Sequence, residues 1–151
     1  MTKNLIETAG RHDDDDVRRI RRAARWAEQM VAEDDPIGRG VVWVNRPSEQ
    51  YLDFDVIMGG IGFDVKSVPL GARWVIGGAS QPRCLVVVVE SDYEASTYEE
   101  WRASARVVGS IPLNYWQFNA PEPGWEPCWN VHMAKVRQLA DVFADEKESR
   151  G

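Results

Sequence analysis

Two adjacent glycines, Gly59 and Gly60, separate two runs of residues that have the composition of β-strands. The runs cover residues 51–58 and 61–68, and apolar and polar side chains alternate along much of each. Both central residues of a type I′ turn need a positive φ angle, which glycine adopts without steric cost. The sequence therefore predicts a β-hairpin with a two-residue turn.

The turn also fixes which residues of the two strands lie opposite each other. Counting outward from the glycines places Asp55 opposite Asp64, and Asp53 opposite Lys66. Side chains alternate between the two faces of a strand, so these four polar side chains share one face and the apolar side chains point the other way. We therefore expect three carboxylates and one ammonium group to converge.

These residues have the chemistry of a site for Mg²⁺ or Mn²⁺. Directly opposed Cβ atoms are about 4.5–5.5 Å apart, so the carboxylates of Asp55 and Asp64 can reach one hard cation, which prefers oxygen ligands. Without a cation, the two like charges repel each other. Lys66 is a compact positive charge that can hold a water molecule or a phosphate oxygen. The alternative is an ordinary half-exposed hairpin whose polar face is hydrated.

Residues 53–67 resemble the motif of the PD-(D/E)XK, or restriction-endonuclease-like, nuclease superfamily. Members carry an aspartate on one strand and an acidic residue, any residue and a lysine on the next, and use Mg²⁺ to hydrolyse phosphodiester bonds. By position, Asp64 and Lys66 match the second half of the motif, and either Asp55 or Asp53 matches the first. The resemblance implies catalytic roles for Asp55, Asp64 and Lys66, and metal binding by Asp53, Asp55 and Asp64.

The order of the predicted elements is also similar to the core of that family, which is helix, three strands, helix and strand. Helices are expected over residues 17–33, 97–108 and 131–144, and strands near 41, 54 and 65 and over 72–76, 84–90 and 113–118. The strands at 72–76 and 84–90 precede the second helix, which departs from the family order. In the family an acidic residue from the first helix often joins the site, so Glu28 and Glu33 are further candidates.

These elements predict an α/β or α+β fold of restriction-endonuclease-like type. We expect a central mixed β-sheet of about five to six strands, flanked by about three helices. The apolar run at 84–90 predicts an inner strand, because both of its faces are apolar. Four aspartates at 13–16 directly precede the first helix, where they can cap free N–H groups, and Pro36 follows its expected end.

The length of 151 residues fits one domain. We expect a flexible N-terminal tail over residues 1–12, a single globular domain over 13–146 and a C-terminal tail over 147–151. The start of the chain lacks the pattern of a secretion signal, and no stretch approaches the roughly 20 uncharged apolar residues of a membrane span. The sequence therefore predicts a cytoplasmic protein without a membrane partner.

The charge and the metal-ligating residues narrow the range of functions. A net charge of −6 argues against a protein that coats nucleic acid passively, but it does not exclude a nuclease. Two cysteines and two histidines offer little material for a zinc site or a serine hydrolase triad. On the first helix, Arg18, Arg22 and Arg25 could follow the phosphate backbone of a nucleic acid, or they could be hydrated or paired with nearby acids.

The sequence supports a leading function and an alternative of a different class. The leading function is a metal-dependent nuclease that acts on nucleic acid, with DNA as one candidate substrate. The alternative is a non-enzymatic acidic binding protein, such as an inhibitor, an immunity protein or a phage accessory protein. Its protein partner would meet an aromatic cluster of Trp116, Trp125 and Trp129, which could equally stack bases or pack in the core. A homodimer is also left open.

Overall fold

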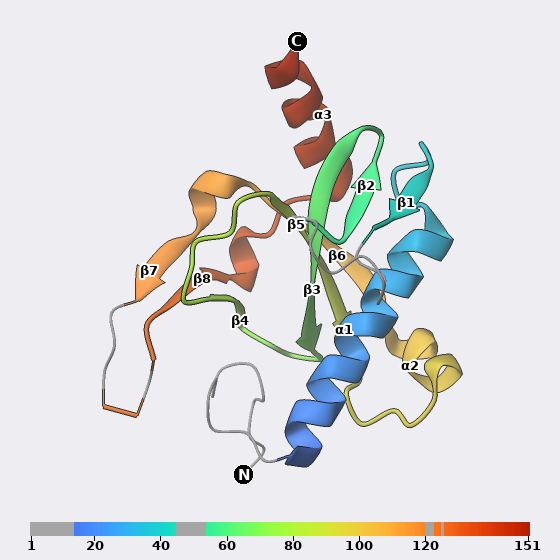
Figure 1. The fold of residues 1–151 in the computed structure, drawn as a ribbon, viewed down its shortest axis with the longest axis vertical. Coiled ribbons are helices and arrows are strands. Elements are labelled where there is room, and N and C mark those ends of the chain that lie inside the picture. The colour runs from blue at the N-terminus through green and yellow to red at the C-terminus, as the bar shows by residue number, and fades with distance from the viewer. Residues whose placement is uncertain (1–13, 45–53, 120–122, 125) are drawn as a thin grey trace.

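The computed structural model describes residues 14–44, 54–119, 123–124 and 126–151. These residues form an α+β fold with a mixed sheet of five strands and an antiparallel sheet of three strands (Figure 1). The helices are α1 (Asp14–Asp34), α2 (Tyr98–Ser104) and α3 (Leu139–Arg150). The strands are β1 (Val41–Trp43), β2 (Val56–Met58), β3 (Ile61–Pro69), β4 (Trp74–Gly78), β5 (Leu85–Ser91), β6 (Arg106–Ile111), β7 (Gln117–Asn119) and β8 (Cys128–His132). The fold class expected from the sequence is confirmed.

The β2–β3 hairpin forms as the sequence predicts. Met58 pairs with Ile61 across the turn. Gly59 and Gly60 have φ angles of 56° and 82°, which are the positive values that a type I′ turn requires. The register of the hairpin is therefore set by these two glycines.

The large sheet has the strand order β1-β2-β3-β5-β6. β3 and β5 run parallel, and the other neighbouring strands run antiparallel. β5 is the strand expected from the run of valines, and its residues 85–89 are all buried. An inner strand that is apolar on both faces needs a covering layer on each side of the sheet.

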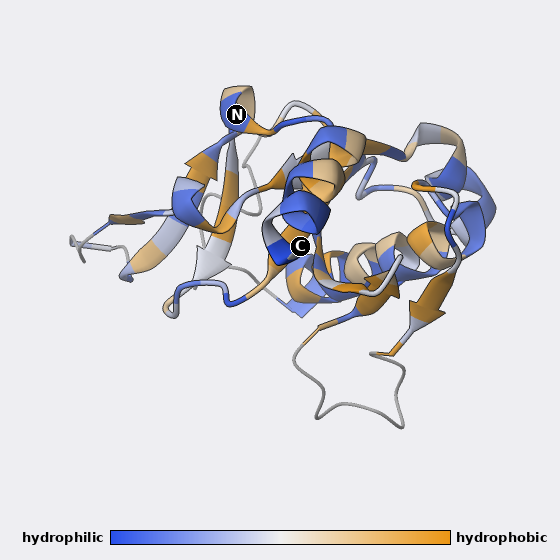
Figure 2. Ribbon diagram, turned by 90° about the horizontal axis from the view of Figure 1, so that it is seen from above, coloured by the Kyte–Doolittle hydropathy of each residue, from blue (hydrophilic) through white to orange (hydrophobic). Residues whose placement is uncertain are grey.

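Two different layers cover the sheet. Apolar side chains of all three helices pack on the face that carries Phe63 and Val87. Residues of the small β4-β8-β7 sheet pack on the opposite face, which carries Val86 and Val88. Figure 2 shows apolar residues along the strands and a mixture of polar and apolar residues on the helices, as expected when only one side of each helix is buried.

The small sheet covers its face unevenly. Val86 and Val88 of β5 are completely buried, whereas Asp64 and Lys66, which pair with them in the parallel register, are partly exposed. The covering layer is therefore complete over β5 and incomplete over β3. This difference leaves the polar residues of β3 accessible.

The first helix agrees with its prediction at its C-terminal end and in its core-facing residues. Ala27 and Val31 face the core, and the helix ends at Asp34, two residues before Pro36. It begins at Asp14, three residues earlier than expected, so three aspartates lie within its first turn, near the positive end of the helix dipole.

Three predicted elements in the C-terminal half were wrong in extent. The second helix was expected to reach residue 108 but ends at Ser104, because the β-branched residues that follow pair with β5 as β6. Val131 begins no helix and belongs to β8. The strand expected over 113–118 is a short 3-10 helix, η1 (Leu113–Tyr115), followed by β7.

The predicted tails have different outcomes. Residues 147–150, which were expected to form part of a C-terminal tail, are the last residues of α3. The N-terminal tail expected over 1–12 lies outside the described residues. Within the described part of the chain, no helix has the length and apolar character needed to cross a membrane.

A tight contact between β6 and the segment before α3 gives a test of the fold. Backbone N–H groups of Ser110 and Arg137 each donate to the other residue's carbonyl, at 2.7 and 3.0 Å. A Cβ atom on Gly109 would lie 2.0 Å from the Arg137 carbonyl oxygen. We therefore expect Gly109→Ala to lower the free energy of unfolding by about 3 kcal/mol in urea titrations.

Gly71→Ala is the control for this substitution. The added methyl group meets no atom within 4 Å there, and the cost is limited to the positive φ of 78°, which amounts to roughly 1–2 kcal/mol. Equal losses for the two variants would contradict the close contact at Gly109.

Candidate functional site

Asp55 lies at the end of β2 and is fixed by three backbone contacts. Its N–H donates to the Phe63 carbonyl at 3.0 Å, and its carbonyl accepts from the Val44 N–H at 2.9 Å. Its carboxylate oxygen Oδ2 accepts from the Val65 N–H at 2.8 Å. The carboxylate is thus held at β3, beside the residue that separates Asp64 from Lys66.

Asp55 and Asp64 were predicted to pair across the hairpin, but they do not form a pair in the ladder of β2 and β3. The ladder of β2 and β3 ends at the pair Val56 and Phe63, and Asp55 also bonds to Phe63 rather than extending the pairing to Asp64. The cause is local, because the Asp55 carboxylate occupies the Val65 N–H. The predicted opposition of Asp53 and Lys66 lies outside the described residues, as does Asp53 itself as a metal ligand.

Asp64 and Lys66 lie on the same face of β3, as expected from the alternation of side chains. Asp64 lies beside Cys84, the residue before β5. Burial and, to a lesser extent, the negative charge of Asp64 raise the pKa of the Cys84 thiol to about 12. The thiol is therefore protonated at neutral pH. Among the described residues, the Lys66 ammonium forms no ion pair or hydrogen bond.

Glu28 of α1 is the acidic residue of the first helix that approaches this region. It is buried, and its Oε1 accepts a hydrogen bond from Trp43 Nε1 at 3.0 Å. The pKa of Glu28 is raised from 4.5 to about 7, mainly by burial and in smaller part by the charges of Asp55 and Asp64. Because the interaction between two charges weakens with distance, this effect on the pKa indicates that Glu28 lies near both aspartates. Glu33, the other candidate, instead accepts a hydrogen bond from the Tyr98 hydroxyl.

Trp43 was not anticipated as part of this region. Its indole N–H is the donor that fixes Glu28, but the contact joins β1 to α1, and no spacing along the sequence indicates it. Cys84 was not anticipated beside Asp64 either. Its proximity to Asp64 depends on the pairing of β3 with β5, which the sequence did not specify.

The carboxylates do not form a complete metal cage. Among the described residues, no group of three or more histidine, cysteine, aspartate and glutamate side chains lies close enough together to hold a metal ion. Mg²⁺ does not need such a cage, because it keeps several water molecules and is usually bound by one or two carboxylates together with phosphate oxygens. Asp55 and Asp64 could supply those carboxylates.

Two of the three arginines that were expected to bind nucleic acid have partners within the protein. Arg22 donates to the Ala95 carbonyl at 2.6 Å, and its guanidinium lies 5.0 Å from the ring centre of Trp26. Arg18 pairs with Asp15 at 2.7 Å on the exposed surface. Arg25 is exposed. The alternative of pairing with nearby acids thus accounts for Arg18, and Arg22 has a structural contact.

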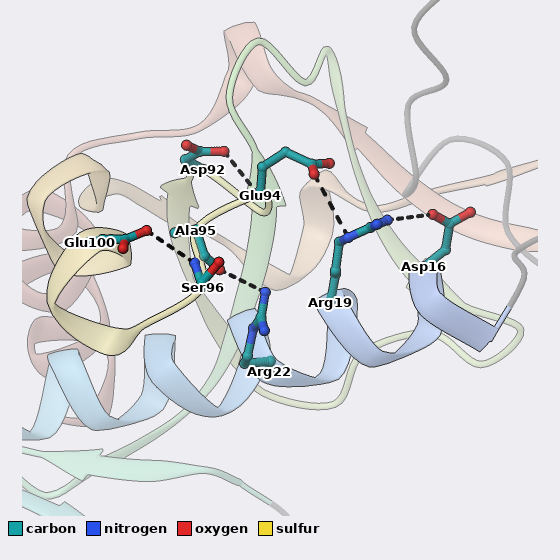
Figure 3. A network of polar contacts seen from close by, with 8 residues as sticks. All are labelled: Asp16, Arg19, Arg22, Asp92, Glu94, Ala95, Ser96 and Glu100. Carbon is teal, nitrogen blue, oxygen red and sulfur yellow. Dashed lines mark hydrogen bonds and ion pairs between the residues drawn. The ribbon is translucent and has the colours of Figure 1, made fainter.

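The contact of Arg22 belongs to a network that attaches α1 to the segment before α2. Figure 3 shows Arg19 and Arg22 pointing from α1 toward this segment. Arg19 bonds to Asp16 at 3.1 Å and lies 3.8 Å from a carboxylate oxygen of Glu94. Much of the basic side of the N-terminal half of α1 therefore stabilises the fold.

Of the three tryptophans of the expected partner interface, the structure describes Trp116 and Trp129, which belong to the same hydrophobic cluster. Trp116 is only 5% exposed and belongs to the core beneath the small sheet, so it is not a surface residue. Trp129 of β8 is partly buried, and its ring centre lies 5.4 Å from that of Phe118. Trp125 lies outside the described residues.

The raised pKa of Glu28 predicts a pH-dependent stability. The folded state binds this proton more tightly than the unfolded state, so the stabilising contribution is fully present below about pH 4.5 and is lost as the pH rises through about 7. One pKa unit corresponds to about 1.4 kcal/mol. We expect the free energy of unfolding to fall by up to about 3 kcal/mol between about pH 5 and about pH 8 in urea titrations.

Glu28→Gln should remove this part of the pH dependence and be more stable than the natural protein at about pH 8, because glutamine cannot ionise. Glu99→Gln, at an exposed position of α2, is the matched control and should leave the pH dependence unchanged. Parallel pH profiles for the natural protein and Glu28→Gln would show that the Glu28 carboxylate is not perturbed.

The chain was also compared with known proteins. No protein-family model, no curated protein and no solved structure matches it. The nuclease motif of residues 53–67 therefore remains a resemblance carried by the sequence, and the geometry around Asp55, Asp64 and Lys66 is the basis for the function proposed below.

Proposed function

We propose that this chain is a metal-dependent nuclease that hydrolyses phosphodiester bonds of nucleic acid, with DNA as the first substrate to test. The cofactor is Mg²⁺ or Mn²⁺, held by Asp55 and Asp64, and Lys66 is the third catalytic residue. The observation that carries the proposal is the hydrogen bond that holds the Asp55 carboxylate at Val65, directly between Asp64 and Lys66 in sequence. The Asp55 carboxylate is thus held at β3, the strand that carries Asp64 and Lys66.

The chemistry follows from these groups. Asp55 and Asp64 would hold the divalent cation, which would polarise a phosphate oxygen and lower the pKa of a water molecule. As the water oxygen bonds to phosphorus, one P–O ester bond breaks and the leaving oxygen takes up a proton. The Lys66 ammonium is available for the negative charge that develops on the phosphate in the transition state. Glu28 has a pKa of about 7 and can accept or donate a proton near neutral pH through an intervening water molecule.

The resemblance to PD-(D/E)XK nucleases supports the same assignment. β1, β2 and β3 follow α1 in the family's order, and the motif lies on the β2–β3 hairpin. β4 and β5 then precede α2, so the departure expected from the sequence is present. The structure shows an α+β fold. That this fold is of the restriction-endonuclease-like type is part of the proposal.

One observation favours the alternative of an acidic binding protein. Phe118 is 50% exposed on β7, an edge strand of the small sheet, beside Trp129. An exposed aromatic pair on a strand edge is suited to a protein–protein interface. A binding protein of this kind requires no divalent cation. A measurement of cation binding therefore distinguishes it from the nuclease.

Metal binding tests the nuclease proposal without a choice of substrate. We expect saturable binding of Mn²⁺ by the natural protein in isothermal titration calorimetry, and loss of that binding in Asp64→Asn, because the amide lacks the negative charge of a ligand. Asp141→Asn removes one charge at an exposed position of α3 and should bind Mn²⁺ normally. Absence of binding to the natural protein, or equal binding by Asp64→Asn, would favour the binding-protein alternative.

The role of Lys66 requires a separate measurement. Lys66→Ala should bind Mn²⁺ normally but cleave linear single- and double-stranded DNA at least about a hundredfold more slowly, because the ammonium stabilises charge in the transition state. Lys135→Ala, at an exposed position, is the control. A Lys66→Ala variant that cleaves DNA at the natural rate would exclude a catalytic role for the lysine.

A further inference from the structure

A cavity of about 230 Å³ opens beside the hairpin, near its turn. Its walls come from the β2–β3 hairpin, the start of β5 with the segment before it, η1 and α3. The lining residues that matter most for its chemistry are Phe54, Gly62, Cys84, Leu113, Glu146 and Arg150. The cavity therefore combines an aromatic ring, aliphatic groups and a pair of opposite charges.

The cavity adjoins the candidate metal site. Gly62 precedes Asp64 by two residues on β3, so both residues are on the same face of the strand. A Cβ atom on Gly62 would lie 2.5 Å from the ring of Phe54, so this ring lies directly over the glycine. Cys84 lines the cavity and also interacts with Asp64. A group bound in the cavity would therefore lie next to the proposed metal ion.

The lining matches the two surfaces of a nucleobase. Phe54, Ile57 and Leu113 offer apolar contacts for the flat faces of a heterocycle. Arg150 Nε donates to Glu146 Oε1 at 3.0 Å, so donor and acceptor groups lie together at the wall, as the polar edge of a base requires. Pockets for drug-sized ligands are larger, at about 300–1,000 Å³. The size therefore suits a single heterocycle rather than a base pair.

Three cationic side chains lie near the same end of the hairpin. Lys147 Nζ lies 3.6 Å from the position of a Cβ atom on Gly60, and both Lys147 and Arg39 contact the ring of Phe143, at 5.8 and 5.4 Å. Arg83 lines the cavity itself. In the described part of the chain, none of these three cationic side chains forms an ion pair. In a chain with a net charge of −6, this end of the hairpin is suited to phosphate groups.

We propose that the cavity receives one unpaired nucleobase of a nucleic-acid strand, while Arg83, Lys147 and Arg39 contact the neighbouring phosphates. This inference rests on the proposed nuclease function and extends it, because it makes the substrate a strand with at least one unpaired base. A base within a duplex would have to leave the stack before it could enter the cavity. The nucleic-acid surface is then at the hairpin and α3, whereas the N-terminal turns of α1 lie at the opposite end of the molecule (Figure 1).

Binding of fluorescein-labelled oligonucleotides, measured by anisotropy in EDTA so that no cleavage occurs, tests this inference. Leu113→Trp fills the cavity from a position that is 39% exposed, so the fold is expected to tolerate it. We expect it to weaken binding of single strands by about tenfold, as expected when a base loses its stacking contacts. Leu70→Trp, at a 55% exposed position beyond the other end of β3, is the matched control and should bind like the natural protein.

A second pair of variants tests where the strand lies. Arg83→Ala combined with Lys147→Ala should weaken binding and reduce its salt dependence, whereas Arg18→Ala combined with Arg25→Ala should do neither. Deoxyribose and ribose oligonucleotides are compared side by side, and the tighter of the two identifies the natural strand. Circular dichroism and Mn²⁺ calorimetry on every variant confirm the fold and the metal site.

The outcomes separate this inference from the function on which it rests. The inference is overturned if the natural protein binds no single strand, if duplex binds as tightly as single strands, or if Leu113→Trp and Leu70→Trp bind equally, while Mn²⁺ binding persists. Failure of the proposed nuclease function is recognised by a separate measurement. In that case the natural protein would show no Mn²⁺ binding that the Asp64→Asn substitution removes. Weaker binding by Leu113→Trp alone supports the cavity.

Discussion

The burial of β5 on both faces is the constraint on which the rest of the structure depends. Its residues 85–89 are all buried, so the protein needs one covering layer on each side of the large sheet. The helices supply one layer and the small sheet supplies the other. Because the small sheet does not fully cover β3, Asp64 and Lys66 can be polar and partly exposed, one strand away from a dry core. The candidate site is located where this second layer ends.

Much of the large sheet could be predicted because its signals are local. The Gly59–Gly60 turn, the valine run of β5 and the C-terminal end of α1 each depend on neighbouring residues, and all three are confirmed. The C-terminal half was predicted less well. There the residues of β6 and β8 become strands by pairing with β5 and β4, and an isolated segment carries little information about such distant partners.

In the candidate site, too, the features that depend on neighbouring residues could be predicted, and those that depend on distant contacts could not. The position of Asp64 and Lys66 on one face follows from the alternation of side chains along β3. The exact relation of Asp55 to them does not, because its carboxylate bonds to the Val65 N–H and the ladder ends at the pair Val56 and Phe63. The contribution of Glu28 depends on the packing of α1 beside β1, where Trp43 donates to it.

Electrostatics connects the metal, the substrate and the stability of the proposed nuclease. Asp55, Asp64 and Glu28 form a negative region that repels a phosphate group, and burial makes the ionised form of Glu28 costly. A divalent cation reverses the sign of this region and favours the ionised carboxylates, so metal binding should precede productive binding of the scissile phosphate. Arg39 and Lys147 lie around the ring of Phe143 near the hairpin turn and, in the proposed nuclease, would hold the strand. The positive groups that would retain the strand are then distinct from the negative groups that would retain the metal.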